Sequence, residues 1–302
     1  MTLSVCMIVK NEEHCLTRAL ESVKDLADQI IIIDTGSTDH TKDIAARYTD
    51  NIYDFAWCDD FSKARNFSLS KATGSWILVL DADEVLAQED HDAIRQLCQN
   101  NSFAGYAFHQ ISYTNDITQY NYIPLLDHDS LYQKYKKYSQ YFSGYISCSI
   151  IRLFRNNLGI HFDGAVHESV DASCREKGKM LKTDLWLHHY QFERGADVIK
   201  EKQLHYLKIY EQHLDEYPEK ARAYRDIGSI YYTYTTNYEK ASHYFRQSLA
   251  LNDRNKKTYI GLGLCYLKQH KFHDALRVFE MGLHIFPGDA HLLSLKNIAR
   301  AT

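Results

Sequence analysis

The 302-residue sequence has little proline and no ordered pattern of cysteines. Proline occurs only 3 times, which suits helix-rich segments. The 7 cysteines are scattered, their number is odd, and no C-x-x-C pair occurs. We therefore expect neither a disulfide framework nor a structural zinc site, and reduced thiols in a cytoplasm fit the pattern better.

Long apolar runs and an excess of positive charge are also missing. No apolar stretch approaches the ~20 residues that cross a bilayer, and the first apolar run turns polar at Lys10, unlike a signal peptide. The formal net charge of -4 disfavours a general nucleic-acid binder. We predict a cytoplasmic protein with no integral membrane segment and no nucleic-acid partner.

The first hundred residues alternate short apolar runs with helical patterns. The apolar runs cover 3–9, 30–34 and 76–81, and a further short strand is expected at 51–55. This alternation predicts an α/β domain with a mostly parallel sheet and helices on both faces. Ligands of such sheets bind beyond the carboxyl ends of the strands, where Asp34 and Asp81 are placed.

The segment 104–190 contains strand-like runs and one long polar stretch. The runs GYAFHQISY and LKTDLWLHHY alternate as strands do, and CSIIRLF is a short apolar run. Between them, 113–145 is rich in tyrosine and has little periodicity. We expect this stretch to form a long loop or lid over a site, with a disordered excursion as the alternative.

From about residue 194 the pattern becomes helical and repeats. One copy contains Tyr224, Ile227, Gly228, Tyr231, Ala241, Phe245 and Ser248, and the next contains Tyr259, Leu262, Gly263, Tyr266, Ala275, Phe279, Gly282 and Pro287. Corresponding positions are 34 or 35 residues apart, which resembles the tetratricopeptide repeat. The preceding helix and the segment after Pro287 are expected to cap the copies, or the array packs on the first domain. We place the domains at 1–192 and 193–302.

The usual phosphate-binding loops of α/β proteins are missing. Neither G-x-G-x-x-G nor G-x-x-x-x-G-K-[ST] occurs, so a bound nucleoside diphosphate would need a counter-charge such as a divalent cation. Asp81 and Asp83 form D-x-D after an expected strand, where a spacing of two puts both carboxylates on one side. Such oxygen ligands suit Mn²⁺ or Mg²⁺. For this motif alone, a solvated loop that caps the next helix is the alternative.

Three longer runs set this motif in a family. They are VCMIVKNEE, IIIIDTGSTDHT and WCDDFSKARNFSLSKATGSWILVLDADE, in this order. Together they resemble the family-2 glycosyltransferases, nucleotide-sugar enzymes of the Rossmann-like GT-A fold. The resemblance covers roughly residues 2–190 and is densest in the first 90. It implies a GT-A α/β domain followed by an all-α tetratricopeptide-repeat domain.

The resemblance also implies roles at the ends of the first two strands. Asn11 and Glu12 would contact the base and ribose, and Asp34 would contact the nucleoside. Ser37 would belong to the same nucleotide-sugar site. Asp34 can also act as a turn or cap residue beside Ser37, and the two roles are compatible.

The run ARN and the D-x-D motif supply the next candidates. Arg65, followed by Asn66, would pair with the diphosphate or orient an aspartate, with a helix-surface ion pair as the alternative. Asp81 would face the ribose or a metal-bound water, and Asp83 would bind the cation directly. We assign Glu84 to the start of the next helix, where a carboxylate favours the helix dipole.

Two later runs complete the candidate site. In FDGAVHES, Gly164 would let the backbone approach the sugar, Glu168 is the favoured base, and His167 is its orienter or an alternative base. A Glu–His surface pair is the alternative for this run. In LWLHHYQF, His189 fits the family's metal-binding histidine, and His188 is the fallback.

The context of His189 departs from the family pattern. Gln191 and Phe192 stand where the family has Gly and Tyr, which puts the ligand role in question. Strand alternation also places His189 on the face of Leu185 and Leu187. A satisfied core histidine is therefore the alternative.

These assignments predict a metal-dependent inverting hexosyltransferase whose nucleotide-sugar donor is expected to be a UDP-sugar. The repeats favour a peptide or protein acceptor, and the two-domain plan resembles bacterial S-glycosyltransferases that modify bacteriocin precursors of the sublancin type. Enzymes that build cell-surface polysaccharide or lipopolysaccharide core share these parts, so a glycan acceptor is the alternative. A non-catalytic repeat adaptor with a nucleotide-binding domain is the rival from another class. The repeats are also a candidate surface for a homodimer.

Overall fold

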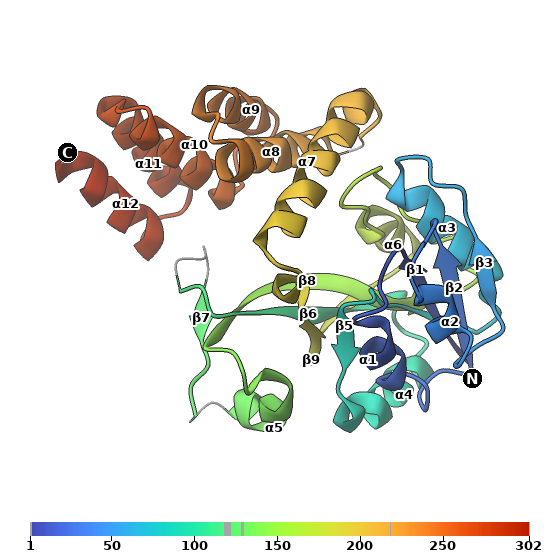
Figure 1. Cartoon of the computed structure of the whole chain (residues 1–302). Coiled ribbons are helices and arrows are strands. Elements are labelled where there is room, and N and C mark those ends of the chain that lie inside the picture. Colours follow the sequence, from blue (N-terminus) through green and yellow to red (C-terminus); the bar gives the residue numbers. More distant parts are fainter. Residues whose placement is uncertain (1, 118–121, 128–129, 218, 302) are drawn as a thin grey trace. The chain divides into compact units, whose positions relative to one another are not determined.

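The computed structural model describes residues 2–117, 122–127, 130–217 and 219–301 (Figure 1). The chain divides into two compact units, Met1–Gly195 and Ala196–Thr302. The first unit contains a large mixed sheet with helices, and the described part of the second unit is helical. The predicted fold class, a GT-A α/β domain followed by an all-α tetratricopeptide-repeat domain, is confirmed.

The sheet of the first unit has a parallel half and a mixed half. Its strand order, among the described residues, is β3-β2-β1-β4-β8-β6-β9-β5, with β7 paired to β8. Strands β2 and β4 flank β1 in parallel, and β3 continues in parallel beyond β2. Because the chain places β4 on the opposite side of β1 from β2, a topological switch point, where such sheets commonly bind ligands, lies at the carboxyl ends of β1 and β4.

The elements of the first unit have the following bounds. The strands are β1 Leu3–Val9, β2 Gln29–Asp34, β3 Ile52–Asp54, β4 Trp76–Val79, β5 Glu84–Leu86, β6 Gly105–Thr114, β7 Ile123–Pro124, β8 Gly144–Arg155 and β9 Met180–His189. The helices are α1 Leu16–Glu21, α2 Thr41–Ala45, α3 Phe61–Lys71, η1 Gln88–Asp90, α4 His91–Gln99, α5 Ser130–Ser139, α6 Asp171–Lys177 and η2 Gln191–Arg194.

Side-chain alternation along the parallel strands creates two hydrophobic cores. On β2, Ile30 and Ile32 belong to one cluster and Ile31 and Ile33 to the other. Residues of α1, α2 and α4 pack into the first cluster, and residues of α3 and α6 pack into the second. Figure 1 shows these two groups of helices on opposite faces of the sheet. Continuous apolar strands are what a sheet buried on both faces requires.

The stretch 113–145 is more regular than expected. It contains the end of β6, the strand β7, the helix α5 and the start of β8, while 118–121 and 128–129 lie outside the described residues. Helix α5 is anchored on the buried carboxylate of Asp90, which pairs with Lys134 and accepts a hydrogen bond from Tyr135 at 2.9 Å. The expectation of a loop was wrong for α5, because its tyrosines provide a buried face that the weak periodicity of the segment hides.

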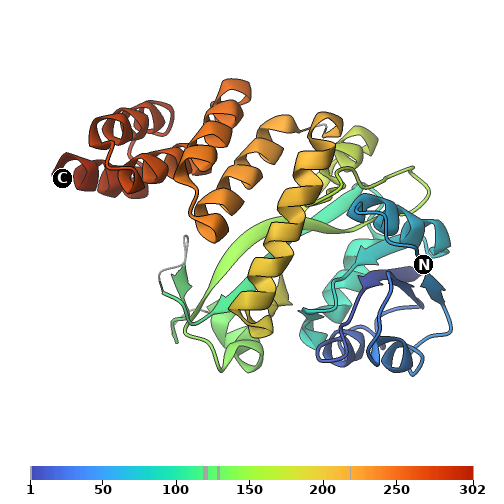
Figure 2. The same cartoon turned by 45° about the horizontal axis from the view of Figure 1, so that its top comes forward.

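The second unit is a stack of helix pairs (Figure 2). Its elements are α7 Ala196–His213, η3 Leu214–Glu216, α8 Lys220–Ile230, η4 Tyr231–Thr235, α9 Tyr238–Leu251, α10 Lys256–Lys268, α11 Phe272–Ile285 and α12 Ala290–Ala301. The two repeat copies form the pairs α8–α9 and α10–α11, and α10 also packs on α9. Helix α12, which follows Pro287, packs on α11 as the predicted terminal cap does.

Glycines and phenylalanines explain the close approach within each pair. A Cβ atom on Gly228 would lie 3.1 Å from the ring of Phe245. At the corresponding place in the next copy, a Cβ atom on Gly263 would overlap the ring of Phe279. Both rings are buried, so the repeat pattern records a small residue on one helix and an aromatic residue on its partner.

Within the described ranges, no helix combines the length and the apolar character that crossing a bilayer requires.

Candidate active site

The carboxyl end of β2 carries a buried aspartate with one oxygen unused. Asp34 is 2% exposed, and its Oδ1 atom accepts hydrogen bonds from the amides of Gly36 and Ser37, both at 2.9 Å. Its Oδ2 atom is buried and has no hydrogen-bond partner among the described residues. Asp34 therefore stabilises the turn that follows β2, and its Oδ2 atom remains available to accept a hydrogen bond from a ligand.

The loop after β1 is tied to the same turn. Asn11 has a φ of 55°, its amide donates to Ser37 Oγ at 3.0 Å, and its side-chain oxygen accepts from the amide of Thr38 at 2.8 Å. The amide of Glu12 donates to Thr41 Oγ1 at 2.7 Å. The structure thus brings Asn11, Ser37 and Asp34 together, and it holds Glu12 beside them on the same loop.

Arg65 connects three segments that are far apart in the sequence, namely α3, the turn at Asp81 and the loop at Glu168. It lies on α3, is 4% exposed, and donates from Nε to Glu168 Oε1 at 2.9 Å. Its Nη2 atom contacts Asp81 Oδ1, and its Nη1 atom is buried without a partner in the described part of the chain. Arg65 is therefore a buried link between two carboxylates, which excludes the alternative of a surface ion pair.

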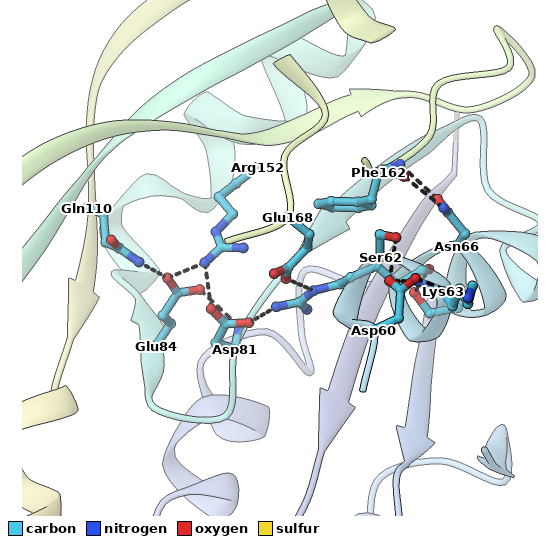
Figure 3. A network of polar contacts seen from close by, with 12 residues as sticks. Asp60, Ser62, Lys63, Asn66, Asp81, Glu84, Gln110, Arg152, Phe162 and Glu168 are labelled. Atoms are coloured by element: carbon cyan, nitrogen blue, oxygen red, sulfur yellow. Dashed lines mark hydrogen bonds and ion pairs between the residues drawn. The ribbon is translucent and has the colours of Figure 1, made fainter. Parts of the chain in front are cut away.

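A second buried arginine, which the sequence reasoning missed, contacts the same aspartate. Arg152 of β8 donates from Nη2 to Asp81 Oδ2 at 2.7 Å and to Glu84 Oε1 at 2.6 Å. Gln110 of β6 donates to the same Glu84 oxygen, as Figure 3 shows. The available signal was a single charged residue inside the apolar run CSIIRLF, because a charge in a buried strand requires a partner.

The two arginines change the acidity of the carboxylates that they contact. Burial alone would raise the pKa of Asp81, but Arg152 and Arg65 hold that pKa well below the usual range. Burial raises the pKa of Glu84, and Arg152 opposes this rise. Asp81 is therefore the ionised partner that the two guanidinium groups share.

The D-x-D segment is a turn and not the end of a strand. Strand β4 ends at Val79, and the amide of Glu84 donates to the carbonyl oxygen of Asp81 at 3.0 Å, which closes the turn. The prediction that Asp81 and Asp83 share one side of an extended backbone was therefore wrong. The assignment of Glu84 to a helix start was also wrong, since this residue begins β5 and is fully buried.

Asp83 faces His189 across this turn. The Asp83 Oδ1 and His189 Nε2 atoms are 3.6 Å apart, and both side chains are largely buried. The other ring nitrogen of His189 lies 2.9 Å from Ser112 Oγ. Burial lowers the pKa of His189, but Asp83 outweighs this effect and raises it.

These two groups form only part of a cation site. Over the described ranges, no cluster of three or more His, Cys, Asp or Glu side chains is arranged to hold a metal. A carboxylate and an imidazole at this separation still fit a divalent ion whose other ligands are water and a donor phosphate. The donor set of this pair therefore fits an ion shared with a bound nucleotide, and not a preformed protein cage.

His188, the fallback ligand, lies in an aromatic cluster. Its ring stacks on Tyr138 with centroids 4.2 Å apart, and its Nδ1 atom lies 2.7 Å from Tyr113 OH. Its Nε2 atom is buried without a partner among the described residues, and burial lowers the pKa of His188 to about 3. His188 is therefore a core histidine. His189, two residues after the buried Leu187, instead has its ring facing the acidic turn.

The run FDGAVHES forms a closed loop that presents Glu168. The backbones of Asp163 and Ser169 bond each other twice at 3.0 Å. Gly164 has a φ of 97°, and His167 is exposed with a φ of 51°. The structure brings Glu168 to Arg65, and it leaves His167 on the outer side of the loop.

Asn66 anchors this loop beside Arg65. Its amide nitrogen donates to the carbonyl oxygen of Phe162 at 2.9 Å, and its oxygen accepts from the amide of Phe162 at 2.8 Å. Asn66 therefore holds the backbone before Glu168, and Arg65, the preceding residue of α3, holds the side chain of Glu168. The sequence indicated Asn66 as part of the ARN motif, but its contact with the loop was not anticipated.

Two curated relatives match about two thirds or more of this chain. A TPR repeat-containing protein of Synechococcus elongatus is 35% identical over 208 residues, which cover 66% of this chain and 44% of that protein. The SPbeta prophage-derived glycosyltransferase SunS of Bacillus subtilis is 27% identical over 220 residues, which cover 72% of this chain and 46% of SunS. The chain thus spans less than half the length of these two relatives.

Solved structures give a weaker comparison. TarS 1-349 of S. aureus in complex with UDP-GlcNAc aligns over 100% of this chain and 91% of that chain. The identity is 14% and the TM-score is 0.44, which is too low to establish a detailed correspondence.

A family model provides the classification. The model described as glycosyl transferase family 2 matches residues 4–158, which is just over half of the 302 residues. The matched range contains the parallel strands, Arg65, the D-x-D turn and Arg152. The chain therefore belongs to glycosyl transferase family 2.

Proposed function

We propose that this chain is a metal-dependent, inverting glycosyltransferase that uses a nucleotide sugar, in particular a UDP-sugar, as its donor. One observation carries this proposal. Through the neighbouring atoms Nε and Nη2 of one buried guanidinium group, Arg65 contacts both Glu168 and Asp81 in the acidic turn. This arrangement supports a role for Glu168 as the base, next to the segment that would receive the leaving diphosphate.

Glu168 is suited to accept the proton of the acceptor. Its Oε1 atom is held by Arg65, whereas Oε2 makes no hydrogen bond among the described residues. In the proposed single displacement, the acceptor atom bonds to the anomeric carbon, the bond from this carbon to the diphosphate oxygen breaks, and Glu168 takes the acceptor proton. Attack from the face opposite the leaving group inverts the anomeric centre.

The charge of the leaving diphosphate needs a counter-charge in this site. A divalent cation, Mn²⁺ or Mg²⁺, would supply it when bound, and Asp83 and His189 would hold that cation. The Nη1 atom of Arg65 is buried with no hydrogen-bond partner among the described residues, and its N–H groups are suited to a phosphate oxygen. Together these groups would stabilise the charge that develops on the diphosphate.

The nucleoside would bind at the ends of β1 and β2. The unused Oδ2 atom of Asp34 would accept a hydrogen bond from the base or ribose. Asn11, Ser37 and Glu12 surround this position through the hydrogen bonds of the loop. Gly164, with its left-handed backbone, would allow the sugar to approach the loop before Glu168.

The acceptor is proposed to be a peptide or protein. Support comes from the second unit, whose paired helices have the repeat architecture that commonly presents extended binding surfaces. Formation of a homodimer through the same helices remains a further proposal.

A donor panel tests the enzymatic proposal. Purified protein is incubated with UDP-, GDP- and dTDP-sugars and Mn²⁺, and release of the nucleoside diphosphate is measured. We expect release from a UDP-sugar and a loss of about 10²–10³-fold in rate for Asp83→Ala. Asp92→Ala on α4, an exposed aspartate outside the site, is the matched control. Absence of turnover with every donor, or wild-type turnover by Asp83→Ala, would contradict the proposal.

Mass spectrometry tests the acceptor. Candidate peptides are co-expressed with the protein and their masses are compared with those of the unmodified peptides. A mass increase of one hexose on a peptide supports the proposal, whereas transfer only to glycolipid or polysaccharide contradicts it.

A further inference from the structure

Arg152 lies beside the site but has no role in the proposed chemistry. We propose that Arg152 is a positioning residue that fixes where Asp83 stands, by holding the residues on both ends of the Asp81–Glu84 turn. This inference rests on the proposed function, in which Asp83 holds a divalent cation. Arg152 would act through Asp81 and Glu84 and would not touch the ion or the substrate.

The first end of the turn is held through Asp81. Arg152 Nη2 contacts Asp81 Oδ2 at 2.7 Å, and Arg65 occupies Oδ1 of the same carboxylate. An arginine contacts each oxygen of Asp81, and Figure 3 shows its carboxylate directed toward Arg152. Asp81 therefore acts as a counter-ion that two arginines share, and not as a free acidic ligand.

The other end of the turn is held through Glu84. Arg152 Nη2 contacts Glu84 Oε1 at 2.6 Å, and Gln110 donates to the same oxygen. Glu84 Oε2 accepts a hydrogen bond from the amide of Asp81 at 2.9 Å, so the side chain of the last residue bonds the backbone of the first. One nitrogen atom of Arg152 thus contacts both ends of a four-residue turn.

Asp83 lies between these two fixed points. Its carbonyl oxygen accepts from the amide of Tyr190 at 3.0 Å, and β5 pairs Glu84 with His189 in register. The backbone is therefore fixed on both sides of Asp83, and the Asp83 carboxylate is left at 3.6 Å from His189. A cation that has only these two protein ligands depends strongly on their separation, since binding sites tolerate little displacement of their ligands.

The charges of this cluster also depend on Arg152. Two arginines, Arg65 and Arg152, face three carboxylates, those of Asp81, Glu84 and Glu168. Removing Arg152 alone would leave buried carboxylates short of a partner, which is a strongly destabilising change in proteins. A variant that removes the charge of Glu84 at the same time lowers this cost, because Asp81 then still has Arg65 as a partner.

Binding of Mn²⁺ to the full chain in the presence of UDP is the test, measured by electron paramagnetic resonance. The variants are Arg152→Lys and the double variant Arg152→Met with Glu84→Gln, with thermal melting as the check on folding. Arg155→Met is the matched control, because Arg155 ends the same strand and the one hydrogen bond of its side chain among the described residues is to the carbonyl oxygen of Asn101 at 3.4 Å.

We expect the double variant to bind Mn²⁺ at least tenfold more weakly than wild type while it remains folded. Arg152→Lys should keep more of the wild-type affinity for Mn²⁺ than the double variant does, because an ammonium group can still pair with one carboxylate although it lacks the planar fork. Arg155→Met should bind as wild type does. Excess Mn²⁺ should restore nucleotide-sugar turnover in the double variant but not in Asp83→Ala.

Two results would overturn the inference, and they can be told apart. If wild type binds Mn²⁺ and the folded double variant binds it equally well, the positioning role is wrong while the proposed function stands. If wild type itself binds no Mn²⁺ in the presence of UDP, the metal-dependent function is wrong, and the positioning role falls with it.

Discussion

At the scale of single residues, two arginines hold the carboxylates of the candidate site in place. Arg65 and Arg152 between them contact Asp81, Glu84 and Glu168, and all of these contacts lie within the first unit. Buried ion pairs of this kind add little net stability, because desolvation offsets their attraction. Their consequence is geometric: each carboxylate has one orientation before any ligand arrives.

Glu168→Gln tests the base directly. A glutamine oxygen can still accept the hydrogen bond from Arg65, so the loop should keep its position, but the side chain can no longer take a proton. We expect the transfer rate to fall by about 10²–10⁴-fold, with binding of the nucleotide sugar unchanged in calorimetry. Glu176→Gln, an exposed glutamate of α6, serves as the control. An active Glu168→Gln enzyme would falsify the assignment of the base.

His188 should make the first unit sensitive to acid. Burial lowers its pKa in the folded protein to about 3, whereas an unfolded chain protonates a histidine near its ordinary value of 6.5. The unfolded state therefore binds more protons between these values, so stability falls as the pH decreases through this window, by roughly 1.4 kcal/mol per pH unit at most.

The measurement compares unfolding by urea for wild type and His188→Phe from pH 7 to pH 4. The phenylalanine should keep the stacking on Tyr138 and remove the titrating group. We expect the stability of wild type relative to the variant to decrease as the pH falls. A difference that does not change with pH would show that His188 titrates normally.

At the scale of elements, the apolar patterns were the reliable part of the sequence. The strands β1 and β2 and the helices of the repeats could be predicted because burial on one or both faces imposes a period on the side chains. The 3-residue strand β5 was missed because it is too short to show a period. The anchoring of α5 was missed because it depends on the distant, buried Asp90.

The candidate site, like the elements, could be predicted only in part from the sequence. Family motifs pointed to Arg65, Asp83 and Glu168, and the structure shows what holds them. The partners of Arg152 and Gln110 were out of reach, because they lie on segments that only the folded sheet brings together. Pairing of strands distant in sequence is not encoded in any local pattern, so the partners of a buried charge cannot be read from its neighbours.

The repeat helices permit a graded test of packing. Gly263→Ala places a methyl group inside the ring of Phe279, whereas Gly228→Ala places one 3.1 Å from Phe245. Overpacking costs typically ~1–3 kcal/mol, while alanine is favoured over glycine in a helix by about 1 kcal/mol. We expect Gly263→Ala to destabilise the helical unit in thermal melts and Gly228→Ala to be close to neutral.

A second substitution checks the cause of that loss. Phe279→Leu introduced together with Gly263→Ala should recover part of the lost stability, because the smaller side chain makes room for the methyl group. Equal melting temperatures for wild type and Gly263→Ala would mean that α10 and α11 do not pack as described.

At the scale of the whole molecule, each unit has its own buried core. The clusters around β1 and β4 belong to the first unit, and residues such as Ile227, Phe245 and Phe279 form the interior of the second. Every residue assigned to the nucleotide sugar, the cation or the base lies before Gly195. The proposed division of labour is therefore between donor chemistry in the first unit and acceptor recognition in the second.

Truncation after Gly195 examines this division. We expect the shortened chain to fold, to bind the nucleotide sugar and to hydrolyse it slowly, and we expect transfer to a peptide acceptor to lose at least tenfold in kcat/KM. Circular dichroism and calorimetry establish that the fragment is folded and binds the donor. Full transfer activity of the fragment would assign the acceptor site to the first unit instead.

The most direct test of the account is the dependence of donor turnover on a divalent cation. Release of UDP from a UDP-sugar by the full chain is measured with Mn²⁺, after chelation with EDTA, and after Mn²⁺ is added back. We expect turnover to be lost on chelation and to return with the ion, because in the proposed function Asp83 and His189 would hold only part of its coordination shell. Turnover that continues at the same rate after chelation would contradict it.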